Sequence, residues 1–453
     1  MDLPRFEHAA RIRPVALLQR AQIRATGALS QTPCPRPAPY ATAIVSGVGE
    51  RLTVAWRSGQ DVLAAEYADG AAHLRVTRGG RTTVHRSRRF ARLPAPARDV
   101  ALTLTGTHLT VLTRDADSPW EARARVDLSE MVDTRDEAWL AALVVEHEGQ
   151  VETLEAGPYG QLGLRDLRVT THPDGAAYRL EDGRAVLAAT SAGPGFFDTA
   201  HTSVWALDPV ALTLEHLSDL YFHRRDRPGV FGDHATHLVR DGDAWLVATS
   251  TWGDFDSHRE GASVAVTLAR SDGDLLSGEH VLETVPLDLP TSGFTSVGVW
   301  DPHLVRTGDG WLVGYVSARK FWRFHPVVAS GPSLGSLRVL GVDPRRRATE
   351  GTTLARVSTG STVGPEWVVL ASDGRDGRRG ERERYPVFDL SMKEIGTLDA
   401  PYPTNIPWPT LLPVSDEDGS DVLMIGFNGR PWGGSLLGYG THGAVVIAKS
   451  VSG

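Results

Sequence analysis

The chain has 453 residues, of which 41% are hydrophobic and 23% are charged, as expected for a globular soluble protein. Its formal net charge of −8 argues against nucleic acid or an anionic membrane as the main partner, because phosphate groups are bound by basic surfaces. No apolar stretch approaches the roughly 20 residues that span a bilayer, and the N-terminal residues lack the pattern of a signal peptide. The single cysteine, Cys34, leaves no disulfide within the chain. The sequence therefore predicts a cytoplasmic protein without a membrane span.

Residues 1–39 predict a short N-terminal helix followed by a stiff connector. Residues 7–28 carry Ala, Leu, Ile, Arg and Gln with few helix breakers, and we interpret them as the helix. Four prolines follow between residues 33 and 39. Because proline lacks a backbone N–H and fixes its φ angle, this segment ends the helix and forms the connector.

From residue 40 onward the sequence indicates β-structure throughout. Short runs of β-forming residues alternate with turns that contain Gly, Asp and Pro, and no further long helical period occurs. Seven strand–turn–strand units follow one another at spacings of roughly 50–67 residues. We therefore predict an all-β fold, and units of this length are typical of four-stranded propeller blades.

A duplicated stretch supports a repeat architecture. Residues 237–247 (HLVRDGDAWLV) return at residues 303–313 (HLVRTGDGWLV) with two differences. Each copy predicts a strand, a Gly-Asp turn and a second strand, and an internal repeat of this kind indicates a quasi-symmetric β-array. Trp245 and Trp311 occupy the same position in the second strand, so we expect them to pack between blades rather than to bind a ligand.

The seven units allow two arrangements. Either all seven are blades, or residues 156–453 form a five-bladed propeller and residues 40–155 form a separate N-terminal β region of two blade-like units. The two N-terminal units lack the entrance acid or Trp-Pro pair and the Trp-Leu-Val second strand of the later ones. We therefore favour five blades with an additional N-terminal region, and seven blades is the alternative.

Carboxylates stand just before or within the first strand of several units. Asp166, Asp233, Asp301 and Glu350 occupy these entrances, and Trp408 occupies the entrance of the last unit. In a propeller the innermost strands begin at one end of the central channel, so these side chains are expected to converge there. Carboxylates beside an aromatic platform suit the cleavage of a glycosidic bond, which needs one carboxylic acid and one carboxylate.

The order of these motifs resembles glycoside hydrolase family 43 and its five-bladed relatives, including the fructan-cleaving enzymes. The residues that carry the resemblance are an entrance Asp, then Trp-Asp-Pro, then Glu-Gly on successive blades. The resemblance implies that Asp233 is the base or nucleophile, that Asp301 tunes the pKa of the acid, and that Glu350 is the acid. Trp300 stands where the fructan-cleaving enzymes have an Arg before the second Asp.

The first of these motifs departs from the family pattern. It reads Gly-Asp-His instead of His-Asp-Pro or Asn-Asp-Pro, and alignment of the duplicated stretches places Asp301 opposite Ala235 rather than Asp233. The alternation of a regular strand would still place Asp233, Ala235 and His237 on one side. Asp166 is therefore an alternative base.

Aromatic and imidazole side chains near the entrances are candidate substrate-binding residues. The substrate of such a site would be a small molecule or an oligosaccharide, bound without a cofactor. Tryptophan faces at strand ends and in loops can stack on sugar rings. The candidates are Trp252, Trp300, Trp322, Trp408, His234 and His303.

Two other functions remain open from the sequence. His234, His237 and His303 lie at two adjacent entrances, and imidazoles that converge on a channel can hold a divalent metal ion. A metal-dependent lyase or isomerase is therefore the first alternative. The second is a non-catalytic propeller that binds carbohydrate or protein, in which the acids only cap strands.

Overall fold

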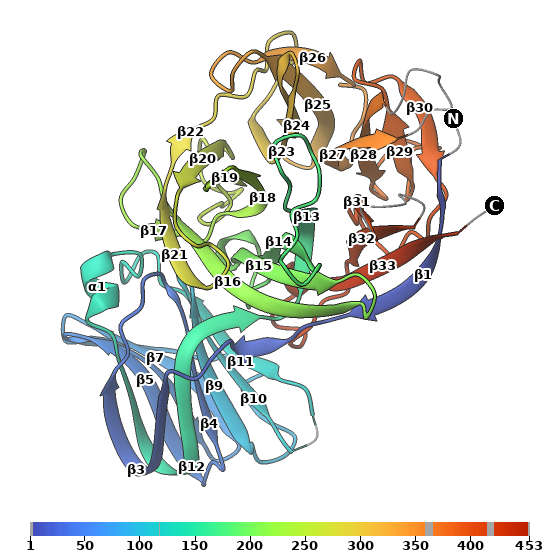
Figure 1. Cartoon of the computed structure of the whole chain (residues 1–453). Helices are drawn as coiled ribbons and strands as arrows, with labels where there is room; N and C mark the ends of the chain where they lie inside the picture. Colours follow the sequence, from blue (N-terminus) through green and yellow to red (C-terminus); the bar gives the residue numbers. More distant parts are fainter. Residues whose placement is uncertain (1–2, 117, 358–365, 415–420, 452–453) are drawn as a thin grey trace.

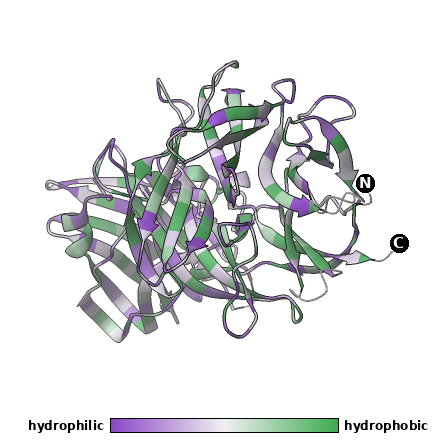
Figure 2. Ribbon diagram, turned by 45° about the horizontal axis from the view of Figure 1, so that its top comes forward, coloured by the Kyte–Doolittle hydropathy of each residue, from purple (hydrophilic) through white to green (hydrophobic). Residues whose placement is uncertain are grey.

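The strands of the chain form a five-bladed β-propeller and a β-module beside it (Figure 1). The computed structural model describes residues 3–116, 118–357, 366–414 and 421–451. Hydrophobic residues concentrate in the strands of both parts, whereas many connecting loops are hydrophilic (Figure 2). The predicted all-β fold and the five-bladed arrangement are confirmed, and the seven-bladed alternative is wrong. No helix among the described residues is long and apolar enough to cross a membrane.

Each blade is a four-stranded antiparallel sheet whose innermost strand faces the channel. From the inside outward, blade 1 contains β13 (Leu164–Val169), β14 (Ala185–Ser191), β15 (His201–Asp208) and β16 (Thr213–His223). Blade 2 contains β18 (His234–Asp241), β19 (Ala244–Ser250), β20 (Val266–Ser271) and β22 (Val285–Pro286). Blade 3 contains β23 (Gly298–Thr307), β24 (Gly310–Lys320), β25 (Arg323–Gly331) and β26 (Arg338–Val342). Blade 4 contains β27 (Thr349–Val357), β28 (Glu366–Asp373), β29 (Tyr385–Phe388) and β30 (Glu394–Leu398).

Blade 5 combines the two ends of the described chain. It contains β31 (Thr410–Pro413), β32 (Val422–Asn428), β33 (Ala444–Val451) and, outermost, β1 (Arg5–Ile12). Two further strands, β17 (Val230–Phe231) and β21 (Gly278–Glu283), pair with β16 of blade 1. Two short 3-10 helices, η1 (Phe197–Thr199) and η2 (Tyr439–Thr441), lie in loops of blades 1 and 5.

The module is one eleven-stranded sheet that folds over on itself. Its strands are β2 (Ala16–Leu18), β3 (Ile23–Pro33), β4 (Tyr40–Ser46), β5 (Arg51–Ser58), β6 (Asp61–Ala68), β7 (Ala71–Arg78), β8 (Arg81–His85), β9 (Asp99–Thr105), β10 (His108–Arg114), β11 (Glu121–Asp127) and β12 (Val144–Gln161). The short helix α1 (Glu137–Ala141) precedes β12. Trp56, Leu74 and Leu102 are fully buried in the core between its two halves. The N-terminal region is therefore a separate sheet rather than a pair of blades.

The predicted N-terminal helix is wrong. Residues 7–28 contribute to β1, β2 and β3, which pair with β33 and β12 far along the chain. Composition alone favoured a helix, but the long-range pairing overrides this weak local preference. Pro14, between β1 and β2, was the local signal against one continuous helix, since proline removes a helical hydrogen bond.

The duplicated stretches form the first two strands of blades 2 and 3. Arg240 lies over the ring of Trp245 at 4.8 Å, and Arg306 lies over the ring of Trp311 at 4.7 Å. Both tryptophans are buried in apolar clusters. Their predicted role in packing is confirmed.

Closure of the ring by β1 generates a prediction about stability. Phe6 is 3% exposed and packs against residues of blades 4 and 5, including Leu370 and Met424. We expect Phe6→Ala to lower the free energy of unfolding by about 3–5 kcal/mol, because it leaves a cavity where the blades are joined. The measurement is urea unfolding followed by tryptophan fluorescence.

The matched control is Leu29→Ala, whose side chain is 75% exposed on the module. It should change the free energy of unfolding by less than about 0.5 kcal/mol. Equal stability of Phe6→Ala and the wild-type protein would contradict the role of β1 in closing the ring.

Candidate active site

The innermost strands of four blades share one irregularity. The strand register shifts after Arg165 in β13, His234 in β18, Trp300 in β23 and Glu350 in β27. The next residue in each strand has a positive φ, which is 54° at Asp166, 60° at Ala235, 58° at Asp301 and 75° at Gly351. Neighbouring side chains of a regular strand face opposite sides, whereas a bulge changes where they point. Here all of these residues except Gly351 line one cavity at the channel.

Blade 4 requires glycine at its bulge. A Cβ atom on Gly351 would lie 2.4 Å from Cδ1 of Trp408, and the positive φ of Gly351 is one that other residues rarely adopt. The glycine therefore lets the backbone after Glu350 pass close to the Trp408 ring. This is the physical reason for the Glu-Gly pair seen in the sequence.

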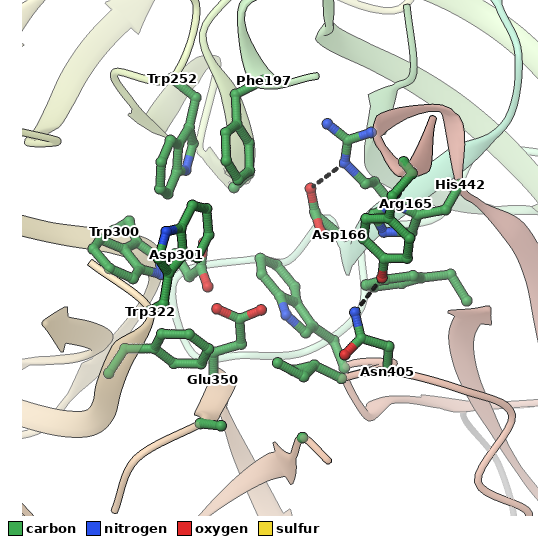
Figure 3. A pocket seen from close by; sticks show the side chains of 18 of the residues that line it. Arg165, Asp166, Phe197, Trp252, Trp300, Asp301, Trp322, Glu350, Asn405 and His442 are labelled. Atoms are coloured by element: carbon green, nitrogen blue, oxygen red, sulfur yellow. Dashed lines mark hydrogen bonds and ion pairs between the residues drawn. The ribbon is translucent and has the colours of Figure 1, made fainter. Parts of the chain in front are cut away.

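The cavity has a volume of about 290 Å³ and a largely aromatic wall (Figure 3). The carboxyl groups of Asp301 and Glu350 lie near each other toward its middle, and Asp166 lies across from them beside Arg165. The three acids come from blades 3, 4 and 1, and blade 2 places Ala235 at the position of Asp166 and Asp301. The bulges thus bring together three of the four predicted catalytic acids.

Glu350 forms no ion pair with a cation among the described residues. Burial and the negative charge of Asp166 raise the pKa of Glu350 from 4.5 to about 8, and the nearby Trp300 and Trp408 side chains oppose this rise only in part. At neutral pH Glu350 is therefore a carboxylic acid that can give up a proton.

Asp301 is only 2% exposed. Burial raises the pKa of Asp301 well above its ordinary range, and the negative charges of Glu350 and Asp166 raise it further. Its Oδ2 atom has no hydrogen-bond partner among the described residues. Asp301 is thus a second neutral carboxyl group, and one of its oxygens is buried without a partner.

Asp166 differs because it has a cation beside it. Nε of Arg165 lies 3.4 Å from Oδ2 of Asp166, and Arg165 is held in place by a 2.6 Å hydrogen bond from Nη1 to the carbonyl oxygen of Gly440. Burial still raises the pKa of Asp166, while Arg165 acts in the opposite direction. Of the three acids, Asp166 is the one whose negatively charged form is most stabilised by a neighbouring positive charge.

Arg168 lies close to the three acids. Its guanidinium lies over the ring of Trp408 at 4.7 Å, and Nη2 donates to the carbonyl oxygen of Asp301 at 3.2 Å. Burial lowers the pKa of Arg168 to about 10, which leaves it charged at neutral pH. It adds a positive charge close to the acids without binding a carboxylate directly.

The structure places Asp233 outside the cavity, so the predicted role of this residue as base or nucleophile is corrected. Oδ2 of Asp233 accepts a 2.8 Å hydrogen bond from Nε of Arg224, and Oδ1 accepts one from the backbone N–H of Gly253 at 3.0 Å. Arg224 also binds Asp254. Asp233 precedes the bulge and points away from the channel, where it fixes a loop of blade 2.

The histidines do not converge on one point. His234 lines the cavity, with Nε2 3.1 Å from the carbonyl oxygen of Phe197. The rings of His237 and His303 stack on each other at 4.2 Å outside that cavity. Nδ1 of His237 accepts from the backbone N–H of Leu304 in the next blade, and Nδ1 of His303 accepts from that of Leu354. The repeated histidine therefore links neighbouring blades, and His303 is not part of the cavity.

The alternative metal site made of His234, His237 and His303 is not formed. Within residues 3–116, 118–357, 366–414 and 421–451, no group of three His, Cys, Asp or Glu side chains is arranged to hold a metal ion. Both stacked rings use a nitrogen for a backbone hydrogen bond. These positions count against a metal-dependent lyase or isomerase that depends on these histidines.

The four predicted tryptophans all line the cavity. Trp252 stacks on Phe197 at 4.4 Å, and Trp322 stacks on the same ring at 6.0 Å. Trp322 is 55% exposed and lies at the mouth, whereas Trp300 and Trp408 are buried deeper. Sequence reasoning missed several lining residues that lie in loops without a recognisable motif, namely Phe196, Phe197, Asn405, Tyr439 and His442.

No family model matches the chain, and no curated protein matches it in sequence. Solved structures that match include a Penicillium chrysogenum α-L-arabinanase complexed with arabinobiose, at 13% identity over 94% of this chain and 98% of the other, with a TM-score of 0.37. A Bombyx mori GH32 β-fructofuranosidase matches at 14% identity over 64% of this chain and 60% of the other, with a TM-score of 0.44. A GH43_1 enzyme from Xanthomonas citri complexed with xylose matches at 14% identity over 64% of this chain and 88% of the other, with a TM-score of 0.41. The function has to be inferred from the chemistry of the cavity.

The raised pKa of Glu350 generates a prediction about stability and pH. Between about pH 4.5 and 8 the folded protein holds a proton on Glu350 that the unfolded chain has released. The contribution of this group to stability therefore falls as the pH rises through that window. We expect Glu350→Gln, which cannot ionise, to raise the Tm at pH 8 by about 1–2 °C for roughly 1 kcal/mol of relief.

The measurement is differential scanning calorimetry at several pH values, with the exposed Glu148→Gln as control. The gain from Glu350→Gln should shrink toward acidic pH, and the control should show no gain. An unchanged or lower Tm of Glu350→Gln at pH 8 would contradict a neutral Glu350 in the folded protein.

Proposed function

We propose that the protein is a glycoside hydrolase in which Glu350 is the general acid and Asp166 is the base or nucleophile. The observation that carries this proposal is the unequal environment of two acids in one aromatic cavity. Glu350 lacks a cation and keeps its proton at neutral pH, whereas Asp166 lies beside Arg165. A carboxylic acid facing a carboxylate is the pair that cleavage of a glycosidic bond needs.

The reaction follows from these protonation states. Glu350 gives its proton to the glycosidic oxygen as the bond from that oxygen to the anomeric carbon breaks. Asp166 either forms a bond to the anomeric carbon, which water later replaces, or takes a proton from the water that attacks directly. In both cases water supplies one hydrogen and one hydroxyl group to the two products, and both acids return to their starting states.

Asp301 completes the acid set as a neutral carboxyl group. In its protonated form it donates a hydrogen bond to a sugar hydroxyl and adds no negative charge near Asp166. Burial and the negative charges of Glu350 and Asp166 raise the pKa of Asp301 and so favour this protonated form.

The aromatic wall favours a sugar as the substrate. Trp252, Phe197 and Trp322 present a series of stacked rings along one side of the cavity. Sugar rings carry apolar C–H faces that pack on aromatic rings and hydroxyl groups that bind carboxyl groups. The substrate proposed for this site is thus a glycoside.

The first test is hydrolysis of a defined set of substrates by the wild-type protein and two variants. The set is p-nitrophenyl α-L-arabinofuranoside, p-nitrophenyl β-D-xylopyranoside, arabinotriose, xylotriose and sucrose. We expect Glu350→Gln and Asp166→Asn each to lower kcat/KM by about 10²–10⁴-fold, because each loses one half of the acid and base pair. NMR of the first product anomer then distinguishes retention from inversion.

Glu148→Gln, on the exposed face of the module, is the control and should keep wild-type activity. Sugar binding without hydrolysis by the wild-type protein would favour a non-catalytic propeller instead. Hydrolysis that survives both Glu350→Gln and Asp166→Asn would overturn the assigned roles.

The second test is the pH dependence of kcat/KM. Activity requires a protonated Glu350, so we expect kcat/KM to fall as the pH rises through about 8. A dinitrophenyl glycoside, whose leaving group needs no proton, should lose much of this alkaline limb. If kcat/KM falls equally at alkaline pH for both leaving groups, the titrating residue is not the general acid Glu350.

A further inference from the structure

A second cavity adjoins the first and is lined by both the propeller and the module. Its volume is about 760 Å³. The two cavities share the side chains of Phe196, Phe197 and Trp322 as lining residues. A ligand in the channel cavity that extends past these shared aromatic side chains would therefore reach the second cavity.

The module supplies one side of the second cavity. Arg125, Asp127, Ser129 and Glu130, at the end of β11 and just after it, are lining residues. The module is fixed against the propeller near this point, since Nη2 of Arg135 donates to the carbonyl oxygen of Gly253 at 2.8 Å. The two sides of the cavity are thus held together by direct contacts.

Arg125 carries unused hydrogen-bond donors at this wall. Its Nε atom is buried without a hydrogen-bond partner, and the guanidinium makes no hydrogen bond to any residue that the structure describes. Nη2 lies where Gly195 leaves room for it, because a Cβ atom there would be 2.7 Å away. Arg125 is half-buried, and the burial of its Nε atom without a partner is destabilising unless a ligand or water accepts a hydrogen bond from it.

The charge of the cavity argues against an anionic ligand. Acidic residues outnumber arginines among its lining side chains, which limits attraction for a phosphate, sulfate or uronate group. Exposed aromatic rings, Trp322 at 55% and Phe196 at 37%, face the same region. Aromatic rings together with mixed polar groups suit a neutral ring that carries hydroxyl groups. The acidic residues are Asp127, Glu130, Asp198, Asp254 and Asp256, and the arginines are Arg125, Arg135 and Arg259.

We propose that the second cavity binds further sugar units of the substrate, so that a neutral oligosaccharide extends from the propeller channel onto the N-terminal module. This inference rests on the proposed glycosidase function, which places the cleaved end of the oligosaccharide in the propeller channel. Arg125 donates hydrogen bonds to the hydroxyl groups of the outer sugar, and Trp322 separates the two binding positions. The module is then part of the substrate-binding surface.

The experiment measures binding in Glu350→Gln, which slows hydrolysis without moving the second cavity. Isothermal titration uses arabinose, arabinotriose, xylose and xylotriose as probes. We expect one trisaccharide to bind at least about tenfold more tightly than its monosaccharide. Adding Arg125→Ala should remove about tenfold or more of that gain.

Two further variants keep the test decisive. Arg125→Lys retains the charge with fewer donors and should lose part of the gain even if Arg125→Ala folds poorly. Arg88→Ala, an exposed arginine elsewhere on the module, should keep all of it.

The outcomes separate this inference from the proposed function. A trisaccharide gain that is absent, or that survives both Arg125 variants, overturns the inference and leaves the hydrolysis tests standing. A gain that depends on Arg125 in a protein that hydrolyses none of the substrates supports the inference as a binding site and overturns the glycosidase assignment.

Discussion

The bulges in the innermost strands of four blades set the positions of the acids. In each bulge one residue adopts a positive φ, a conformation that costs a non-glycine residue about 1–2 kcal/mol. Asp166, Ala235 and Asp301 all adopt this unfavourable conformation. The backbone N–H of Asp301 is satisfied by Oγ of Ser250 at 3.0 Å, and that of Ala235 by Oγ1 of Thr190 at 3.2 Å. Hydroxyl groups of the preceding blade thus stabilise the strained backbone that presents two adjacent side chains to the channel.

The electrostatics of the cavity follow from this geometry. Asp301 is buried and Glu350 is half-buried, and neither forms an ion pair with a described residue, so their charged forms are disfavoured and their pKa values are raised. Asp166, in contrast, has Nε of Arg165 3.4 Å from its carboxylate. An acid removed from water without a cation weakens the fold at higher pH, and the same feature keeps Glu350 protonated for the proposed reaction. Stability and the proposed chemistry therefore depend on the same carboxyl group in opposite ways.

The parts of the structure that the sequence predicted are those with a repeating local pattern. The duplicated stretch indicated a repeat fold and the packing role of Trp245 and Trp311, and the entrance motifs favoured five blades over seven. The helix predicted for residues 7–28 is wrong, because pairing with strands far along the chain determines the secondary structure of that segment. Asp233 was misplaced because regular alternation was assumed through a bulge that only the structure reveals. The contact of Arg125 with the second cavity has no sequence signal, since it depends on how two separate sheets pack.

The most direct test of the central claim is the protonation state of Glu350. Infrared difference spectra between the wild-type protein and Glu350→Gln isolate the carboxyl group of this one residue. We expect a protonated carboxyl band at neutral pH that disappears with a midpoint near pH 8, since the pKa of Glu350 is raised to about 8. A Glu350 that is already ionised at neutral pH, with a midpoint near the ordinary value of about 4.3, would contradict it.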